Sequence, residues 1–218
     1  GTFATVPEMI TLIEGANNVL EPPIVLLPLD RASADPVDPN TTSIITSSPV
    51  EINGEMFEPI VLTIPPQTAR IEGTGELFDG EIHISRIPDP TQGPRPLPDN
   101  MVLSVYIALQ PFGVVYETPV PIVFPNVEHF PVGSIVDIFG LNHDTGRMDK
   151  VGEGRVELDD MVHSIGGVIH NNSWHGFVPQ PPILEKNEDT NDTSQMPDQA
   201  ATCGGGSEFC VQSGNLSV

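Results

Sequence analysis

Histidine and aspartate side chains in the second half of the chain have the chemistry of a metal site. His143 and Asp144 are neighbours, and His163, His170 and His175 follow them along the chain. Two or three imidazoles with one carboxylate suit Zn²⁺ if the fold brings them together. Their spacing matches no known zinc motif, so we expect turn and surface roles, with zinc binding as the alternative.

A second group of residues has the chemistry of a calcium site. Asp35, Asp38 and Asn40 place two carboxylates and one amide oxygen in a single segment, although no complete EF-hand loop is present. Runs of acidic residues more often form solvated surfaces than ion sites. We therefore expect a solvated acidic loop and no required cofactor, with Ca²⁺ as the candidate ion.

Sequence motifs for catalysis are absent. The chain contains no G-x-S-x-G, no H-E-x-x-H and no phosphate-binding glycine loop. Ser164 follows His163, but neighbours on a strand point to opposite faces and cannot form a catalytic pair. We therefore expect a protein that is not an enzyme.

The two cysteines, Cys203 and Cys210, lie close together in a polar, glycine-containing segment. Exported proteins oxidise such pairs, whereas cytosolic proteins keep them reduced. Because the chain also looks exported by composition, we expect a disulfide that closes a small loop.

N-x-[S/T] sequons are glycosylation candidates if the source glycosylates such sites. They occur at Asn40, Asn171, Asn191 and Asn215.

The charge is strongly one-sided. Acidic residues number 30 and basic residues 8, which gives a formal net charge of −22. Nucleic acids and anionic membrane surfaces recruit clustered Lys and Arg, so both are excluded as expected partners. No apolar run reaches the roughly 18 residues of a membrane span, so membrane insertion is not expected either. This composition suits an extracellular or cell-surface location.

Hydrophobic periodicity predicts an all-β fold. The 24 prolines and 20 glycines disfavour long helices. In segment 101–110, Leu103, Val105 and Ile107 alternate with polar residues, so we expect them on one core-facing side of a strand. We expect Trp174 to fill the core and its neighbour His175 to face outward. The expected strands are 59–64, 81–87, 101–110, 120–124, 134–141, 150–158, 161–169 and 173–178.

The expected domain organisation has three parts. Residues 1–58 read as an extended N-terminal arm, and residues 59–178 as a β-sandwich that could divide into two small subdomains near residue 126. Residues 179–218 read as a flexible acidic tail. Within the sandwich, Asn142 to Gly146 has the residues of a hairpin turn between two strands.

Several stretches resemble a known module of large bacterial surface proteins. They are 97–100, 108–114, 119–126, 131–139, 142–148, 151–156, 166–168, 173–177 and 213–216. Over about residues 75–178 the chain resembles the module that precedes YD repeats in Rhs/teneurin-like proteins. The resemblance implies an immunoglobulin-like or ZU5-like β-sandwich with a structural role and no catalytic mechanism.

These observations favour a structural or assembly module of an extracellular surface protein, or a subunit that polymerises outside the cell. The expected partner is then a second copy, bound when the N-terminal arm adds a strand, or another domain of the same protein. The alternative is an adhesion module that binds Ca²⁺ or carbohydrate.

Overall fold

The computed structural model describes residues 3, 13–18, 26–88 and 101–180. The chain divides into two units, Gly1–Pro181 and Pro182–Val218, and only the first contains described residues. The expected tail, Cys203, Cys210, Asn191 and Asn215 therefore lie outside the described residues.

The described part is an all-β structure, which confirms the predicted fold class. Its only helix is a three-residue 3₁₀ turn, η1 (Arg31–Ser33). The strands are β1 (Asp35–Pro36), β2 (Ser43–Thr46), β3 (Val50–Ile52), β4 (Glu55–Phe57), β5 (Val61–Ile64), β6 (Ala69–Ile71), β7 (Glu81–Arg86), β8 (Val105–Gln110), β9 (Val114–Val120), β10 (Ile122–Pro125), β11 (Ile135–Asn142), β12 (Arg147–Val156), β13 (Met161–Ser164), β14 (Ile169–Asn171) and β15 (Trp174–Pro179).

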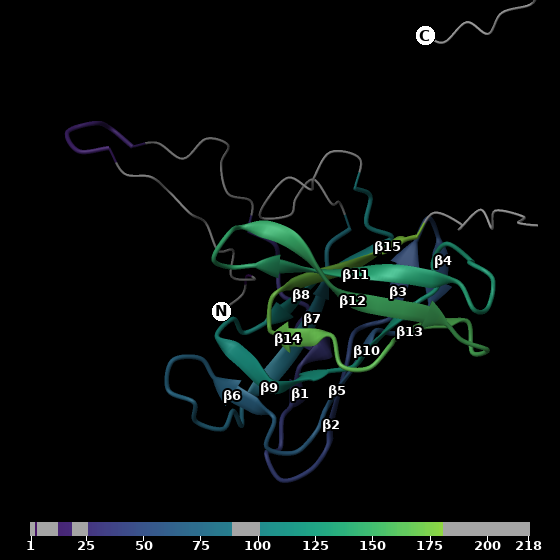
Figure 1. Ribbon diagram of the computed structural model, residues 1–218, viewed down its shortest axis with the longest axis horizontal. Helices are drawn as coiled ribbons and strands as arrows, with labels where there is room; N and C mark the ends of the chain where they lie inside the picture. The colour runs from purple at the N-terminus through teal and green to yellow at the C-terminus, as the bar shows by residue number, and fades with distance from the viewer. Residues whose placement is uncertain (1–2, 4–12, 19–25, 89–100, 181–218) are drawn as a thin grey trace, which may run out of the picture. The chain divides into compact units, whose positions relative to one another are not determined.

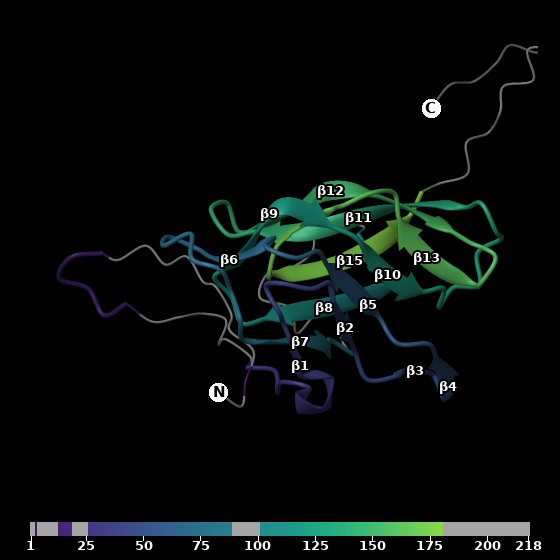
Figure 2. The ribbon, with the colours of Figure 1, turned by 90° about the horizontal axis from the view of Figure 1, so that it is seen from below.

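Ten strands form one antiparallel sheet in the order β1-β7-β8-β15-β11-β12-β13-β10-β5-β2. Its two end strands lie side by side, because β2 packs against both β1 and β7 (Figures 1 and 2). The backbone N–H of Thr46 on β2 donates to Asp35 Oδ2 on β1 over 2.7 Å. The large sheet thus curls nearly into a barrel, which protects the edges that an open sheet would expose.

Two smaller sheets complete the fold. One has the order β14-β9-β6 and the other pairs β3 with β4. Tyr116 and Val120 of β9 are buried in the same hydrophobic core as the large sheet. The three-stranded sheet therefore closes over the interior of the curled one, in the manner of a sandwich. The finer immunoglobulin-like or ZU5-like assignment stays a prediction.

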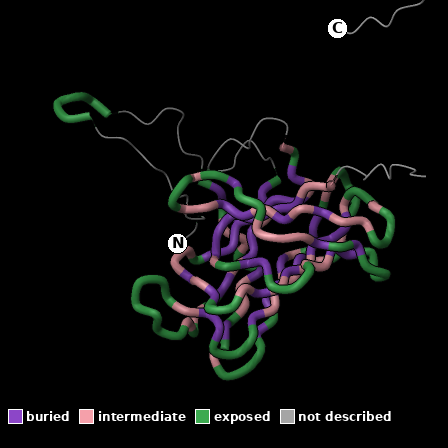
Figure 3. The backbone as a smooth tube through the Cα atoms, in the orientation of Figure 1, coloured by how far each residue is buried: buried purple, intermediate pink, exposed green. Residues whose placement is uncertain are grey.

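The main core fills the interior of the curled sheet, where the buried residues of Figure 3 concentrate. Val105, Ile107 and Leu109 of β8 point into it, and Phe124 and Phe177 stack with ring centroids 5.4 Å apart. Ile82 and Ile84 alternate into the same core, as their spacing predicts.

A second hydrophobic cluster lies on the outer face of the same sheet. Trp174 and Tyr106 form its centre, with ring centroids 5.6 Å apart, and Leu27 and Leu103 belong to it. Strands β8 and β15 are therefore buried on both faces. Trp174 is fully buried as predicted, but in this outer cluster rather than in the main core.

Two expectations about strand faces are wrong. Leu103 does not share a face with Val105 and Ile107, because β8 begins at Val105 and the chain bends at the residue before it. His175 does not face outward. It pairs in register with Ile107, so it lies on the interior face while Trp174 lies on the outer one.

The segment expected to be an N-terminal arm contributes strands to the fold. Within residues 1–58, strands β1 to β4 belong to sheets, and Val37, Ile45 and Val50 are buried in the main core. Apolar alternation in 43–46 was overlooked because the surrounding residues are rich in Pro, Asp and Thr. The described residues also show no division near residue 126, since β10 pairs with both β5 and β13.

Candidate functional site

The structure brings three of the singled-out histidines around one cavity of about 320 Å³. The cavity lies where the β11–β12 hairpin meets the strands β14 and β15 that follow it. Its titratable lining residues are Glu72, His143, Asp144, Asp149, His170 and His175. His163 is elsewhere, on β13, where its Nε2 lies 2.8 Å from Asp159 Oδ2.

The predicted hairpin turn positions His143 and Asp144. Asn142 Oδ1 accepts hydrogen bonds from the backbone N–H groups of Asp144 and Thr145, at 2.9 and 3.1 Å. Gly146 has φ 64° and donates its N–H to the Asn142 carbonyl, which closes the loop. The hairpin prediction is thus confirmed.

Ser173 is a partner of His143 that the sequence reasoning missed. His143 Nε2 lies 2.7 Å from Ser173 Oγ, and that hydroxyl donates to the Leu141 carbonyl over 2.9 Å. Because the single hydroxyl hydrogen is already used, His143 must donate from Nε2. Ser173 is fully buried, so this pair orients the imidazole and does not present an attacking oxygen to a substrate. The partners are 30 residues apart, and no local pattern connects them.

His175 is the most perturbed titratable group of the cavity. Burial lowers its pKa to about 4, while the carbonyls of Asn171 and Phe139 partly oppose that shift and His143 and His170 add to it. Its Nε2 lies 3.2 Å from the Asn171 carbonyl oxygen, and its buried Nδ1 has no hydrogen-bond partner among the described residues. The imidazole is therefore neutral at pH 7.

The structure does not bring the histidines into a metal-binding arrangement. Across the described ranges, no group of three or more His, Cys, Asp or Glu side chains could hold a metal ion. The zinc alternative therefore has no support from the geometry.

The calcium candidates take part in local hydrogen bonds. Asp38 Oδ1 accepts from the backbone N–H of Asn40 and Oδ2 accepts from the Thr41 hydroxyl, and these bonds lower the pKa of Asp38. Asp35 Oδ2 closes the sheet through Thr46, as described above. Both carboxylates thus have structural roles, and calcium binding by Asp35, Asp38 and Asn40 stays a prediction.

The two described sequons differ in accessibility. Asn40 and its hydroxyl partner Thr42 are both exposed, whereas Asn171 is followed by Asn172 and Ser173, which are fully buried. An oligosaccharide added at Asn171 would have to displace packed residues.

We expect glycosylation at Asn40 and none at Asn171 when the chain is secreted from a glycosylating host and folds before modification. The measurement is intact mass before and after glycan removal, in a background carrying Asn191→Gln and Asn215→Gln. Asn40→Gln should abolish the remaining mass difference, and Asn171→Gln should leave it unchanged. A glycan that survives Asn40→Gln but not Asn171→Gln would contradict the expectation.

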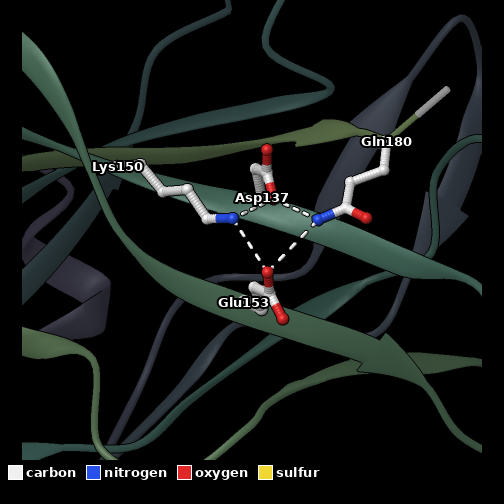
Figure 4. Close-up of polar contacts among 4 residues, drawn as sticks. All are labelled: Asp137, Lys150, Glu153 and Gln180. Carbon is white, nitrogen blue, oxygen red and sulfur yellow. Dashed lines mark hydrogen bonds and ion pairs between the residues drawn. The ribbon is translucent and has the colours of Figure 1, made fainter.

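A four-residue polar cluster lies on the outer face of β11 and β12 (Figure 4). Asp137 and Glu153 are directly opposite each other across the two strands, and Lys150 Nζ lies 2.8 Å from a carboxylate oxygen of each. Gln180 Nε2 donates to both carboxylates. Burial raises the pKa of Asp137, but the bonds from Gln180 and Lys150 outweigh this effect and lower it overall.

A β-bulge makes this cluster possible. Residues three apart on a regular strand point to opposite faces, yet Lys150 and Glu153 share one. The register shifts between Ile138 and Phe139, so that Val151 is the extra residue and Lys150 pairs with Phe139. Lys150 can therefore bridge two like charges that would otherwise repel each other.

Lys150→Met is expected to lower the melting temperature, and more so at low ionic strength, because Asp137 and Glu153 then face each other without a cation. Lys150→Arg is the matched control and should keep most of the stability. Adding Glu153→Gln to Lys150→Met should recover part of the loss. Identical thermal melts for Lys150→Met and the unmodified chain in low salt would contradict this role.

No helix in the described residues is long and apolar enough to cross a membrane. Comparison of the chain with models of protein families, with characterised proteins and with solved structures finds no significant match.

Proposed function

We propose that the chain is a structural or assembly module of an extracellular or cell-surface protein. The observation that carries the proposal is the closure of the large sheet, whose end strands meet and whose interior is filled by packed apolar side chains. Such a shell is suited to transmitting force or spacing other parts. The described residues assemble no nucleophile with an accessible base, which favours this role over an enzymatic one.

Self-association belongs to the same proposal. The ladder ends that remain outside the closed sheet, β3, β4, β6 and β14, are three residues long each. Short edges limit strand addition, so an ordered contact has few places to form. Residues 35–57 are part of the chain's own sheets, which restricts any donated strand to the residues before η1.

The charge sets the conditions under which copies can meet. Identical chains of net charge −22 repel each other at long range. Screening limits that repulsion to about 8–10 Å at physiological salt, whereas backbone pairing and apolar burial act at contact. Association should therefore increase with salt and with protein concentration.

Sedimentation velocity of the full chain at rising concentration, with and without about 0.15 M salt and CaCl₂, tests the assembly role. We expect salt-promoted ordered oligomers, visible in electron micrographs. A monodisperse monomer throughout would remove the subunit role and leave that of a domain within a larger protein. Calorimetric heats with Ca²⁺ or a glycan panel would instead favour the adhesion module.

A further inference from the structure

The cavity between the β11–β12 hairpin, β14 and β15 is lined on its polar side by hydrogen-bond acceptors. Three carboxylates reach it, from Glu72, Asp144 and Asp149, and its described lining contains neither Lys nor Arg. Asp149 Oδ2 accepts a bond of 2.9 Å from Asn142 Nδ2, which holds that carboxylate in place at the rim.

The neutral tautomers of two histidines add further acceptors. His143 donates from Nε2 to Ser173, so its Nδ1 carries a lone pair. His175 lies with Nε2 against the Asn171 carbonyl, which makes Nε2 the donor and leaves Nδ1 as an acceptor. That Nδ1 is buried and has no partner among the described residues, and an unsatisfied buried acceptor is unfavourable unless something donates to it.

Gly140 keeps the wall beside this acceptor open. A Cβ atom at residue 140 would lie 2.9 Å from His175 Nδ1 and 3.2 Å from Val151 Cγ1. Any side chain there would therefore press against the imidazole and fill the base of the cavity. Glycine at this position leaves room beside the unsatisfied nitrogen.

We propose that this cavity binds an organic cation with several N–H donors, a guanidinium or a primary ammonium group. Such groups have five or three donors and no acceptor, which complements a wall of carboxylates and imidazole lone pairs. Charge-assisted bonds to the carboxylates strengthen the complex. A volume of about 320 Å³ fits a small amine or the end of an Arg or Lys side chain. The proposal does not depend on the structural role proposed above.

Calorimetric titration of the full chain tests the ligand class. The probes are agmatine, a capped Gly-Arg-Gly peptide and the same peptide with neutral citrulline in place of arginine. We expect the arginine peptide to bind at least about tenfold more tightly than the citrulline peptide. Binding of agmatine alone would assign the site to a free amine, and binding of the peptide would assign it to a partner's side chain. Equal affinity for the charged and neutral peptides, or no binding of any probe, would overturn the proposal.

Variants locate the binding. Asp144→Asn with Asp149→Asn should weaken cation binding about tenfold, and Gly140→Ala should weaken it by filling the base of the cavity. Glu157→Gln is the matched control, since it removes one exposed carboxylate beyond the other end of β12 and should leave the affinity unchanged. An equal loss in Glu157→Gln would reveal unspecific attraction to an acidic protein and overturn the site. Displacement of agmatine by equimolar Zn²⁺ or Ca²⁺ would identify a metal site instead and also overturn it.

Discussion

Gly167→Ala is expected to destabilise the fold by more than about 4 kcal/mol, well above the effect of an ordinary substitution. A Cβ at residue 167 would lie 1.8 Å from the carbonyl oxygen of Pro119 and 2.5 Å from its carbonyl carbon. These are backbone atoms, so no rotamer change can relieve the clash. The next residue, Val168, donates its N–H to Val120 over 3.1 Å, and β14 pairs with β9 at Ile169. Moving the chain away would therefore separate the three-stranded sheet from its partner.

Gly166→Ala is the matched control for this prediction. Gly166 has φ 79°, and a Cβ there meets no atom within 4 Å, so alanine introduces backbone strain without a clash. Such strain costs about 1–2 kcal/mol. Urea unfolding of both variants gives the two free energies directly. If Gly167→Ala lost no more stability than Gly166→Ala, the close approach to Pro119 would not exist in solution.

Local turn chemistry could be predicted from the sequence where it was sought. Asn142 to Gly146 folds as its residues indicate, and β7 alternates Ile82 and Ile84 into the core. The same reasoning applied to Asn53-Gly54 would have found β3 and β4. Asn53 has φ 53° and Gly54 has φ 84°, the positive values that a two-residue hairpin turn requires. That signal was available, and it argues against an extended arm reaching residue 58.

The face that a strand residue occupies could not be predicted where both faces are buried. Alternation separates Trp174 from His175 correctly, but it does not tell which side is the interior. The outer face of β8 and β15 is covered by Leu27 and Leu103, which are distant in sequence from Trp174. Because that cover depends on tertiary packing, a pattern of two could only place one side chain inside and leave the other for solvent.

The cavity required long-range pairing that no motif records. His143 comes from the β11–β12 turn, His170 from β14 and His175 from β15, and their approach depends on β15 pairing with β11. The histidines were singled out from residue type alone. Their tautomers, the buried Ser173 and the space beside Gly140 follow only from the assembled sheet.

His175 is expected to make the fold less stable as the pH falls from about 6.5 to about 4. In the unfolded chain its imidazole has the ordinary pKa near 6.5, whereas burial lowers the folded pKa to about 4. Between these values the unfolded state binds more protons, so stability falls as the pH falls through the window. Two and a half units of pKa difference correspond to about 3 kcal/mol, fully present above pH 6.5 and lost below pH 4.

The pH dependence of the unfolding free energy, compared between variants, isolates this contribution. His175→Gln removes the titrating group, so its curve should be flatter than that of the unmodified chain by about 3 kcal/mol across the window. His163→Gln is the control, because His163 is half-exposed on β13 and should leave the slope of the His175 window in place. Carboxylates such as Asp137 and Asp159, whose pKa values are lowered, titrate in all three proteins and cancel in the comparison. Parallel curves for His175→Gln and the unmodified chain would show that His175 is accessible to protons in the folded state, and the buried neutral imidazole would then be wrong.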